Sequence, residues 1–182
     1  MARVVRFLVW LAVLLLLTPA TTPAGGLSFF DFEQGASNGT NGLRGAVDVV
    51  VQDDSVYVVG EQDDNISVWY RDPVTNQLTF VEVEEDGVGG VDGLRNPTGV
   101  ASTTDGYCVY VSANHNPPGP GDGTLVVFSR GGGFGGPLTF VEVKEDDAGG
   151  VTGLGNASGI VVSLDGKHVY VVSEGDEAIA IF

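Results

Sequence analysis

The chain has 182 residues and a formal net charge of −16, with 24 acidic residues against 8 basic ones. This length suits one domain. The acidity argues against nucleic-acid or anionic-membrane partners, because their phosphate groups would be repelled. Its one cysteine, Cys108, excludes an intrachain disulfide, while 28 glycines and many valines favour strands joined by turns.

Residues 1–24 have the pattern of a secretory signal peptide. Arg3 and Arg6 precede an apolar run from Phe7 to Leu17, and small residues and prolines follow up to Ala24. The run is shorter than the roughly 20 residues that cross a bilayer. We therefore predict export to the periplasm, the cell surface or the medium, with cleavage after Ala24 or after Ala20 and no membrane association afterwards.

Residues 25–182 are a repeat region. The segment Leu78–Val83 (LTFVEV) returns 60 residues later as Leu138–Val143, and Gly99 and Tyr110 return at the same offset. A weaker copy begins at Leu27 with LSFF. Self-similarity at a fixed period indicates a repeat architecture.

Each unit divides into four short strands. The middle unit offers Gly99–Ser102, Cys108–Val111, Thr124–Phe128 and then Leu138–Val143. Asp105-Gly106 between the first two is a hairpin signal, since glycine accepts the positive φ of a tight turn. The fold class predicted is all-β, with β-propeller blades of four antiparallel strands. A β-sandwich is the alternative, although it does not require near-identical units.

The strand motifs resemble those of the β-propeller lactonase family, the group of 6-phosphogluconolactonase-like and YVTN-type repeat proteins. They are Gly-Val-Ala-Ser, Asp-Gly and Val-Tyr-Val over residues 99–111, and Gly-Ile-Val-Val-Ser-Leu-Asp-Gly-Lys-His-Val-Tyr-Val over residues 159–171. These motifs specify blades rather than catalysis. The resemblance implies a ring of typically seven blades.

This chain holds about three blades, which predicts an incomplete ring. One opening strand of the fourth type, Leu27–Glu33, precedes two whole units and three further strands that end at Phe182. We expect either a truncated chain or one that assembles with copies of itself to complete the propeller. Both outer blades should then expose apolar flanks.

Acidic loops on one propeller face are the candidate ligand site, and an ordinary solvated surface is the alternative. The insertion Asn114–Gly123 is the most distinctive of these loops. Calcium would suit the carboxylates, although no EF-hand loop is present; no other metal and no organic cofactor is indicated. The candidate residues are Asp63, Asp64, His115, Asp122, Glu174 and Asp176.

Two functions follow from these features. The first is an exported, non-catalytic binding or surface module whose partner is a small molecule or a protein. The second, implied by the resemblance, is a lactonase acting on sugar-derived lactones at the channel mouth, with His115 and nearby carboxylates as acid–base candidates. No catalytic residue can be assigned from the sequence, and whether the chain is an enzyme stays open.

Overall fold

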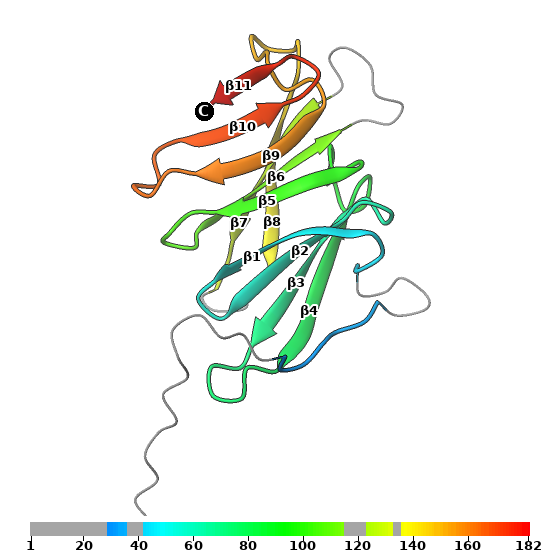
Figure 1. The fold of residues 1–182 in the computed structure, drawn as a ribbon, viewed down its shortest axis with the longest axis vertical. Helices are drawn as coiled ribbons and strands as arrows, with labels where there is room; N and C mark the ends of the chain where they lie inside the picture. The colour runs from blue at the N-terminus through cyan, green and yellow to red at the C-terminus, as the bar shows by residue number, and fades with distance from the viewer. Residues whose placement is uncertain (1–28, 36–41, 115–122, 133–135) are drawn as a thin grey trace, which may run out of the picture. The chain divides into compact units, whose positions relative to one another are not determined.

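A computed structural model describes residues 29–35, 42–114, 123–132 and 136–182. The contacts divide the chain after Asp31, and the compact unit Phe32–Phe182 is described by itself. Its described residues form eleven strands and no helix (Figure 1). Among the residues that can be described, therefore, no helix is long and apolar enough to cross a membrane. The predicted signal peptide lies outside the described residues.

The strands form three antiparallel sheets in which neighbours in the chain are neighbours in space, as predicted for propeller blades. We call them blades 1, 2 and 3 in chain order. Blade 1 consists of β1 (Ala46–Gln52), β2 (Ser55–Gly60), β3 (Asn65–Arg71) and β4 (Leu78–Glu85); blade 2 of β5 (Pro97–Ser102), β6 (Cys108–Asn114), β7 (Gly123–Arg130) and β8 (Leu138–Glu145); blade 3 of β9 (Ala157–Val162), β10 (Val169–Ser173) and β11 (Ala178–Ile181).

The predicted Asp-Gly hairpins join the first two strands of blades 2 and 3. Gly106 and Gly166 have φ angles of 70° and 68°, which is where glycine is favoured. Before each glycine, a hydroxyl donates to the aspartate: Thr103 Oγ1 to Asp105 Oδ1 at 2.5 Å in blade 2. The matching bond in blade 3 runs from Ser163 to Asp165 at 2.6 Å. The sequence repeat is thus a repeat of turn geometry.

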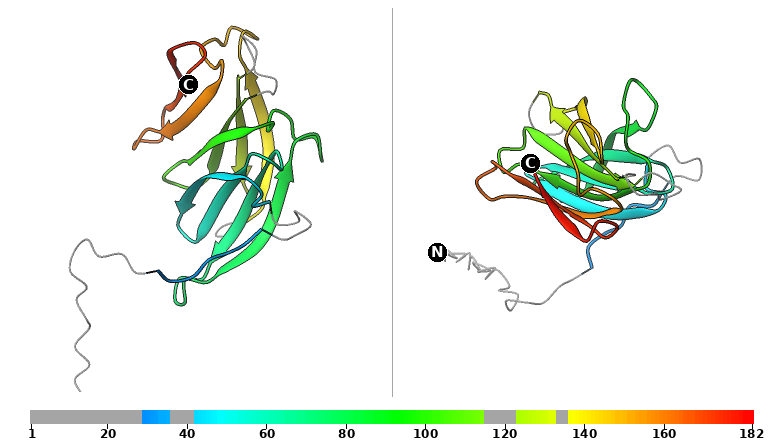
Figure 2. Two further views of the ribbon diagram at one scale, coloured as in Figure 1. Left: turned by 45° about the vertical axis from the view of Figure 1, so that its right-hand side comes forward. Right: turned by 90° about the horizontal axis from the view of Figure 1, so that it is seen from above.

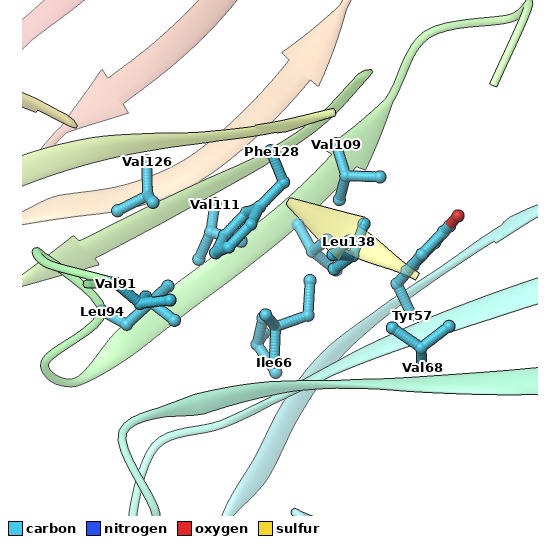
Figure 3. Close-up of a cluster of buried hydrophobic side chains, with 12 residues drawn as sticks. Tyr57, Ile66, Val68, Val91, Leu94, Val109, Val111, Val126, Phe128 and Leu138 are labelled. Atoms are coloured by element: carbon cyan, nitrogen blue, oxygen red, sulfur yellow. The ribbon is translucent and has the colours of Figure 1, made fainter. Parts of the chain in front are cut away.

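The blades pack face to face and bury two apolar cores. Strand β5 lies against β1 and β2, and β9 lies against β5 and β6, so the three sheets fan out in chain order (Figure 2). The larger core lies between blades 1 and 2, where Tyr57, Ile66 and Phe128 are fully buried (Figure 3). Leu125 and Leu154 are buried in the second core, which lies between blades 2 and 3. Burying each such side chain contributes about 1.5–3 kcal/mol.

Polar contacts also join the blades. Asp48 Oδ2 on β1 accepts the N–H of Val100 on β5 at 2.9 Å. Glu82 Oε1 on β4 accepts the N–H of Leu138 at 2.5 Å. Because each partner would lose its hydrogen bond if the blades slid, these contacts fix how blades 1 and 2 meet.

Of the predicted opening strand, Leu27–Glu33, the described residues Phe29–Glu33 do not form a strand. Leu27 and Ser28 lie outside the described residues, and Phe29–Gly35 has no regular secondary structure. Phe29, Phe30 and Phe32 are 83%, 65% and 69% exposed. The physical reason is that a strand needs a partner edge for its N–H and C=O groups, and no described strand pairs with this segment.

The predicted apolar flanks are present on the outer blades. On blade 1 the leading flank, which faces away from blade 2, exposes Val47, Val49 and Val51. On blade 3 the trailing flank, which faces away from blade 2, exposes a second set: Val161, Val172, Ile179 and Ile181. The inner faces of the same sheets are buried against another blade, whereas no described residue covers these outer faces.

Candidate functional site

A polar hollow opens where the loops of blades 1 and 2 meet. It encloses about 450 Å³. Its lining comes from the segment before β1, from the β2–β3 turn and from the segment before β5. The lining residues are Arg44, Glu61, Gln62, Asp64, Arg95 and Asn96. We call this site the polar hollow.

The β2–β3 turn is held in place by the segment that leads into β1. The N–H groups of Glu61 and Gln62 donate to the carbonyl oxygens of Gly45 and Arg44 at 3.0 and 3.3 Å. Gly60 permits this approach, because a Cβ there would stand 2.7 Å from the Gly42 carbonyl oxygen. The side chains of the turn are therefore presented to the hollow by backbone contacts.

Asp63 positions one of the two arginines. Its Oδ1 atom accepts a hydrogen bond from Arg44 Nη1 at 3.1 Å. The other carboxylate oxygen, Oδ2, is buried and has no hydrogen-bond partner. The Arg44 side chain is 56% exposed, whereas that of Asp63 is 12% exposed. The Arg44 guanidinium can therefore also contact a ligand.

Asp64 fixes the second wall of the hollow. It adopts a left-handed φ of 49°, and its Oδ1 accepts the N–H of Asn96 at 2.8 Å. In blade 3, Asp176, the counterpart of Asp63, accepts the N–H of Gly155 in the segment before its own blade at 2.8 Å. These two carboxylates act as backbone acceptors that join a turn to the segment leading into a blade.

The structure separates the six predicted site residues. Asp64 lines the polar hollow and Asp63 pairs with Arg44 beside it, whereas Glu174 and Asp176 lie on the exposed β10–β11 turn of blade 3. His115 and Asp122 fall outside the described residues. Within the described ranges, no group of three or more His, Cys, Asp or Glu side chains could hold a metal ion.

Sequence reasoning missed the arginines. Arg44 and Arg95 each follow a Gly-Leu pair, and in blade 3 the corresponding triplet ends in Gly155. The signal that could have revealed them is a pair of basic residues at matching loop positions in a chain of 24 acids and 8 bases. The third unit has Gly155 at this position. The junction of blades 1 and 2 therefore carries two arginines that the junction of blades 2 and 3 does not repeat.

The hollow combines groups that recognise anions with groups that recognise hydroxyls. A guanidinium matches the two oxygens of a carboxylate or phosphate group. Glu61 and Asp64 can accept from hydroxyl groups, and the amides of Gln62 and Asn96 can donate or accept. This set suits a small ligand that carries both one anionic group and several hydroxyls.

No family model matches the chain, and no curated protein matches it either. Solved structures do. One is a periplasmic gluconolactonase from Pseudomonas aeruginosa, with 17% identity, a TM-score of 0.57, and coverage of 74% of this chain and 34% of that one. Another is a candidate 6-phosphogluconolactonase from Bacteroides fragilis, with 15% identity, a TM-score of 0.55, and coverage of 74% and 33%.

A third similar structure is the β-propeller domain of Cps50 (Swd1) from Myceliophteria thermophila, with 17% identity, a TM-score of 0.52, and coverage of 74% of this chain and 38% of that one. The chain thus spans about a third of the length of the structures it resembles. At these identities the likeness shows architecture and not activity. The described unit is three consecutive blades of a β-propeller, the fold shared by these lactonase-like proteins.

Proposed function

We propose that this protein is a binding module for a small polyhydroxylated anion, such as a sugar acid or its lactone. The observation that carries the proposal is the polar hollow, in which Arg44 and Arg95 face the same space as Glu61 and Asp64. Its volume of about 450 Å³ falls toward the lower end of the 300–1,000 Å³ typical of small-molecule sites.

The arginines would hold the anionic end of the ligand. Arg44 is pre-oriented by Asp63, which lowers the entropy lost when the guanidinium binds an oxyanion. Glu61, Gln62 and Asn96 would receive the hydroxyls, as polar side chains do in other sites for polar ligands. Arg44 and Arg95 are two of the 8 basic residues in the chain, and their guanidinium groups would offset the negative charges of Glu61 and Asp64 in the hollow.

Export is the second part of the proposal. The basic start and short apolar run of residues 1–24 support it, as does the periplasmic location named for the similar gluconolactonase. A module outside the cytoplasm would meet sugar acids taken up from the surroundings. Fusion of residues 1–24 to a reporter that is active only after export tests this part directly.

Lactone hydrolysis is the second candidate function, favoured by the fold shared with the lactonase-like structures. In the hollow, Glu61 would take a proton from a water molecule that attacks the lactone carbonyl. An arginine would stabilise the oxyanion that forms before the ring oxygen leaves. As the C–O bond of the ring breaks, Glu61 returns the proton to the leaving ring oxygen. The product is the open-chain acid, whose carboxylate the same arginine can bind.

Calorimetric titration with gluconate, with δ-gluconolactone and with glucose tests the binding proposal. We expect gluconate to bind and glucose to bind far more weakly. Arg95→Ala should raise the dissociation constant about tenfold or more, the typical effect of losing a charge-assisted hydrogen bond. Lys167→Ala removes one positive charge from the exposed β9–β10 turn and is the matched control. Equal affinities for the two variants would contradict the proposal.

The same variants separate binding from hydrolysis. If the chain is a lactonase, Glu61→Gln should abolish release of acid from δ-gluconolactone and leave gluconate affinity within about a factor of a few. If it only binds, no protein-dependent acid release should occur with any variant. Hydrolysis that survives Glu61→Gln unchanged would rule out Glu61 as the general base.

A further inference from the structure

We propose that Asp92–Gly93 is a site of spontaneous covalent modification, at which Asp92 converts through a cyclic imide into an isoaspartyl residue. This proposal does not depend on the proposed function. It rests on a comparison within the molecule. The described residues contain four aspartate–glycine pairs, and three of them are held by hydrogen bonds that Asp92–Gly93 does not make. A further pair begins at Asp122, outside the described residues.

The reaction needs only the two residues and water. The glycine nitrogen attacks Cγ of the aspartic acid, a C–N bond forms, and a C–O bond of the carboxyl group breaks. The departing hydroxyl takes the proton of the amide and leaves as water. A second water molecule then adds to the main-chain carbonyl carbon of the imide, whose C–N bond breaks as the nitrogen regains a proton. The chain now runs through Cβ and Cγ, and the former main-chain carbonyl is a carboxylate.

Hydrogen bonds in the folded chain oppose this attack in two ways. A glycine N–H that donates a hydrogen bond is held away from the carboxyl carbon, and a carboxylate that accepts one cannot turn toward the nitrogen. A hydrogen-bonded carboxylate is also harder to protonate, and the acid form is the one that loses water. The hydrogen bonds of each pair therefore indicate whether it can react.

The hairpin pair of blade 2 is held at both reacting groups. The N–H of Gly106 donates to the carbonyl oxygen of Thr103 at 2.9 Å. Asp105 Oδ1 accepts the Thr103 hydroxyl at 2.5 Å and the Tyr107 N–H at 3.1 Å. The hydroxyl, and then the Tyr107 N–H, also lower the pKa of Asp105 below its ordinary value. This pair should therefore react slowly.

The hairpin pair of blade 3 is held in the same way. The N–H of Gly166 donates to the carbonyl oxygen of Ser163 at 2.8 Å. Asp165 Oδ1 accepts the Ser163 hydroxyl at 2.6 Å and the Lys167 N–H at 3.2 Å. The two hairpins should therefore resist isomerisation equally.

The pair at the end of blade 1 is also restrained. The N–H of Gly87 donates to the carbonyl oxygen of Val91 at 2.9 Å. Asp86 Oδ1 accepts the N–H of Leu94 at 3.0 Å. Its nitrogen and its carboxylate are thus both engaged, although the pair lies in the same β4–β5 loop as Asp92.

Asp92–Gly93 has neither restraint. Asp92 is exposed in the β4–β5 loop. Within the described ranges, nothing accepts the N–H of Gly93 and nothing donates to the Asp92 carboxylate. The carboxyl group can therefore rotate onto the neighbouring nitrogen in contact with water. Gly93 also has no Cβ to hinder the attack.

Blade 3 has the same loop position without the reactive side chain. The residues 60 positions further on are Thr152 and Gly153. The φ angles of Gly93 and Gly153 are 86° and 89°, so the main chain turns alike at both places. Threonine has no carboxyl carbon and cannot form the imide. Asp92→Thr is therefore a substitution that the fold already accepts at the matching position.

Isomerisation at this pair would disturb the junction of blades 1 and 2. Val91 and Leu94, which flank the pair, are 3% and 0% exposed and lie in the larger core (Figure 3). An isoaspartyl residue lengthens the main chain between them by one atom. Both side chains cannot then keep their places, because a close-packed core has no room for the shift.

Gly93 itself cannot absorb the added atom. Its carbonyl oxygen accepts the Thr124 hydroxyl at 2.7 Å, and a Cβ on it would stand 2.6 Å from the Val143 side chain. Displacement of Gly93 would therefore disturb β7 and β8. Arg95 lies two residues further on and lines the polar hollow, so the same displacement would alter a wall of that site.

Ageing of the folded protein in mildly acidic buffer, followed by proteolysis and mass spectrometry, tests the proposal. Isoaspartyl peptides keep their mass, separate by chromatography and accept a methyl group from an isoaspartate-specific methyltransferase. The hydrogen bonds restrain both reacting groups at the other three pairs. We therefore expect Asp92 to isomerise about tenfold or more faster than the held aspartates, which are Asp86, Asp105 and Asp165.

Ageing in concentrated urea is the control for effects of the local sequence. Unfolding removes the hydrogen bonds of all four pairs, and their rates should then agree within about a factor of a few. Asn38 and Asn41 also precede glycines and lie outside the described residues. Their deamidation changes the mass of the peptide, so it is counted separately.

Two variants sharpen the test. Aged wild-type protein should contain a second population that unfolds at lower urea concentration, in proportion to its isoaspartate content, whereas aged Asp92→Thr should unfold in one transition. Thr103→Val removes the hydroxyl that donates to Asp105 and should raise isomerisation there severalfold. Asp165 in the same molecule is the matched reference and should not change.

Three results would overturn the proposal. They are equal rates at the four aspartates of the folded protein, an equally large lead of Asp92 in urea, and aged wild-type and Asp92→Thr proteins that unfold alike. Circular dichroism of each variant before ageing shows whether its blades are folded, so that misfolding is not mistaken for a change in reactivity.

Discussion

Blades 2 and 3 have nearly the same strands but different surroundings. Leu125 on β7 is 2% exposed, while Ile179, its counterpart on β11, is 65% exposed. Blade 2 has a neighbour on both faces and blade 3 has one on a single face. The repeated sequence therefore specifies a surface, and the presence of the next blade decides whether that surface stabilises the fold.

The largest expected difference is between Leu125→Ala and Ile179→Ala. Truncating the buried leucine should lower the free energy of unfolding by about 2–5 kcal/mol, through lost burial and the cavity left behind. Truncating the exposed isoleucine in dilute, monomeric protein should change it by less than about 0.5 kcal/mol. Urea denaturation measures both values. Equal losses would mean that the two blades are covered alike.

The polar contact between blades gives a smaller effect. Asp48→Ala removes the acceptor of the Val100 N–H and should cost about 1–3 kcal/mol, since it leaves a donor unpaired between two sheets. Asp92→Ala, on an exposed loop residue, is the control and should be nearly neutral in the same denaturation experiment. If Asp92→Ala lowers the free energy of unfolding as much as Asp48→Ala does, the effect comes from the loss of a charge and not from the contact between the blades.

Acid should weaken the hairpin turns of blades 2 and 3 equally. The Thr103 hydroxyl, and then the Tyr107 N–H, lower the pKa of Asp105 below its ordinary 3.8. The Ser163 hydroxyl and then the Lys167 N–H do the same for the pKa of Asp165. Because the folded pKa is depressed, this stabilisation is complete above the ordinary value and is lost as the pH falls through the folded one.

Thermal unfolding from neutral pH down to below 3.8 measures this effect. Asp105→Asn and Asp165→Asn should each flatten the pH dependence of the melting temperature by a similar small amount. A large difference between them would show that the turns, too, depend on the neighbouring blade.

The smallest expected effect lies on the outer strand of blade 1. Burial, and then the charge of Glu82, raise the pKa of Glu84 above its ordinary value. The carboxyl therefore favours folding at low pH, and this advantage is lost as the pH rises through the folded pKa. Glu84→Gln should stabilise the protein at neutral pH by no more than about 0.5 kcal/mol. A melting temperature that falls would contradict this assignment.

The strands were predictable because they depend on local patterns. Alternation and turn residues placed β4 to β11 within a few residues, and the 60-residue period grouped them into blades. The bulges at Val68–Trp69 and at Val127–Phe128 were not predicted, since a register shift depends on the partner strand as well as on the strand itself. The predicted strand at Leu27–Glu33 was wrong over its described residues, Phe29–Glu33, for a related reason. Its pattern is that of a strand, but pairing is not local.

The candidate site was predicted less well than the fold. The acidic residues stand out in the sequence, yet Asp64 and Asp176 serve as acceptors for backbone N–H groups. Arg44 and Arg95 are 51 residues apart in the sequence and share one hollow only because two blades meet there. Composition reveals which charges are abundant, while the tertiary fold decides which of them face a common space.

Hydrogen exchange of β7 and β11 tests the comparison of blades 2 and 3 most directly. We expect the amides of β7, which is paired on both edges, to be protected. Those of β11, which is paired on one edge only among the described strands, should exchange faster than those of β7. Equal exchange of the two strands would contradict the account in which a paired edge and a covered face protect a blade.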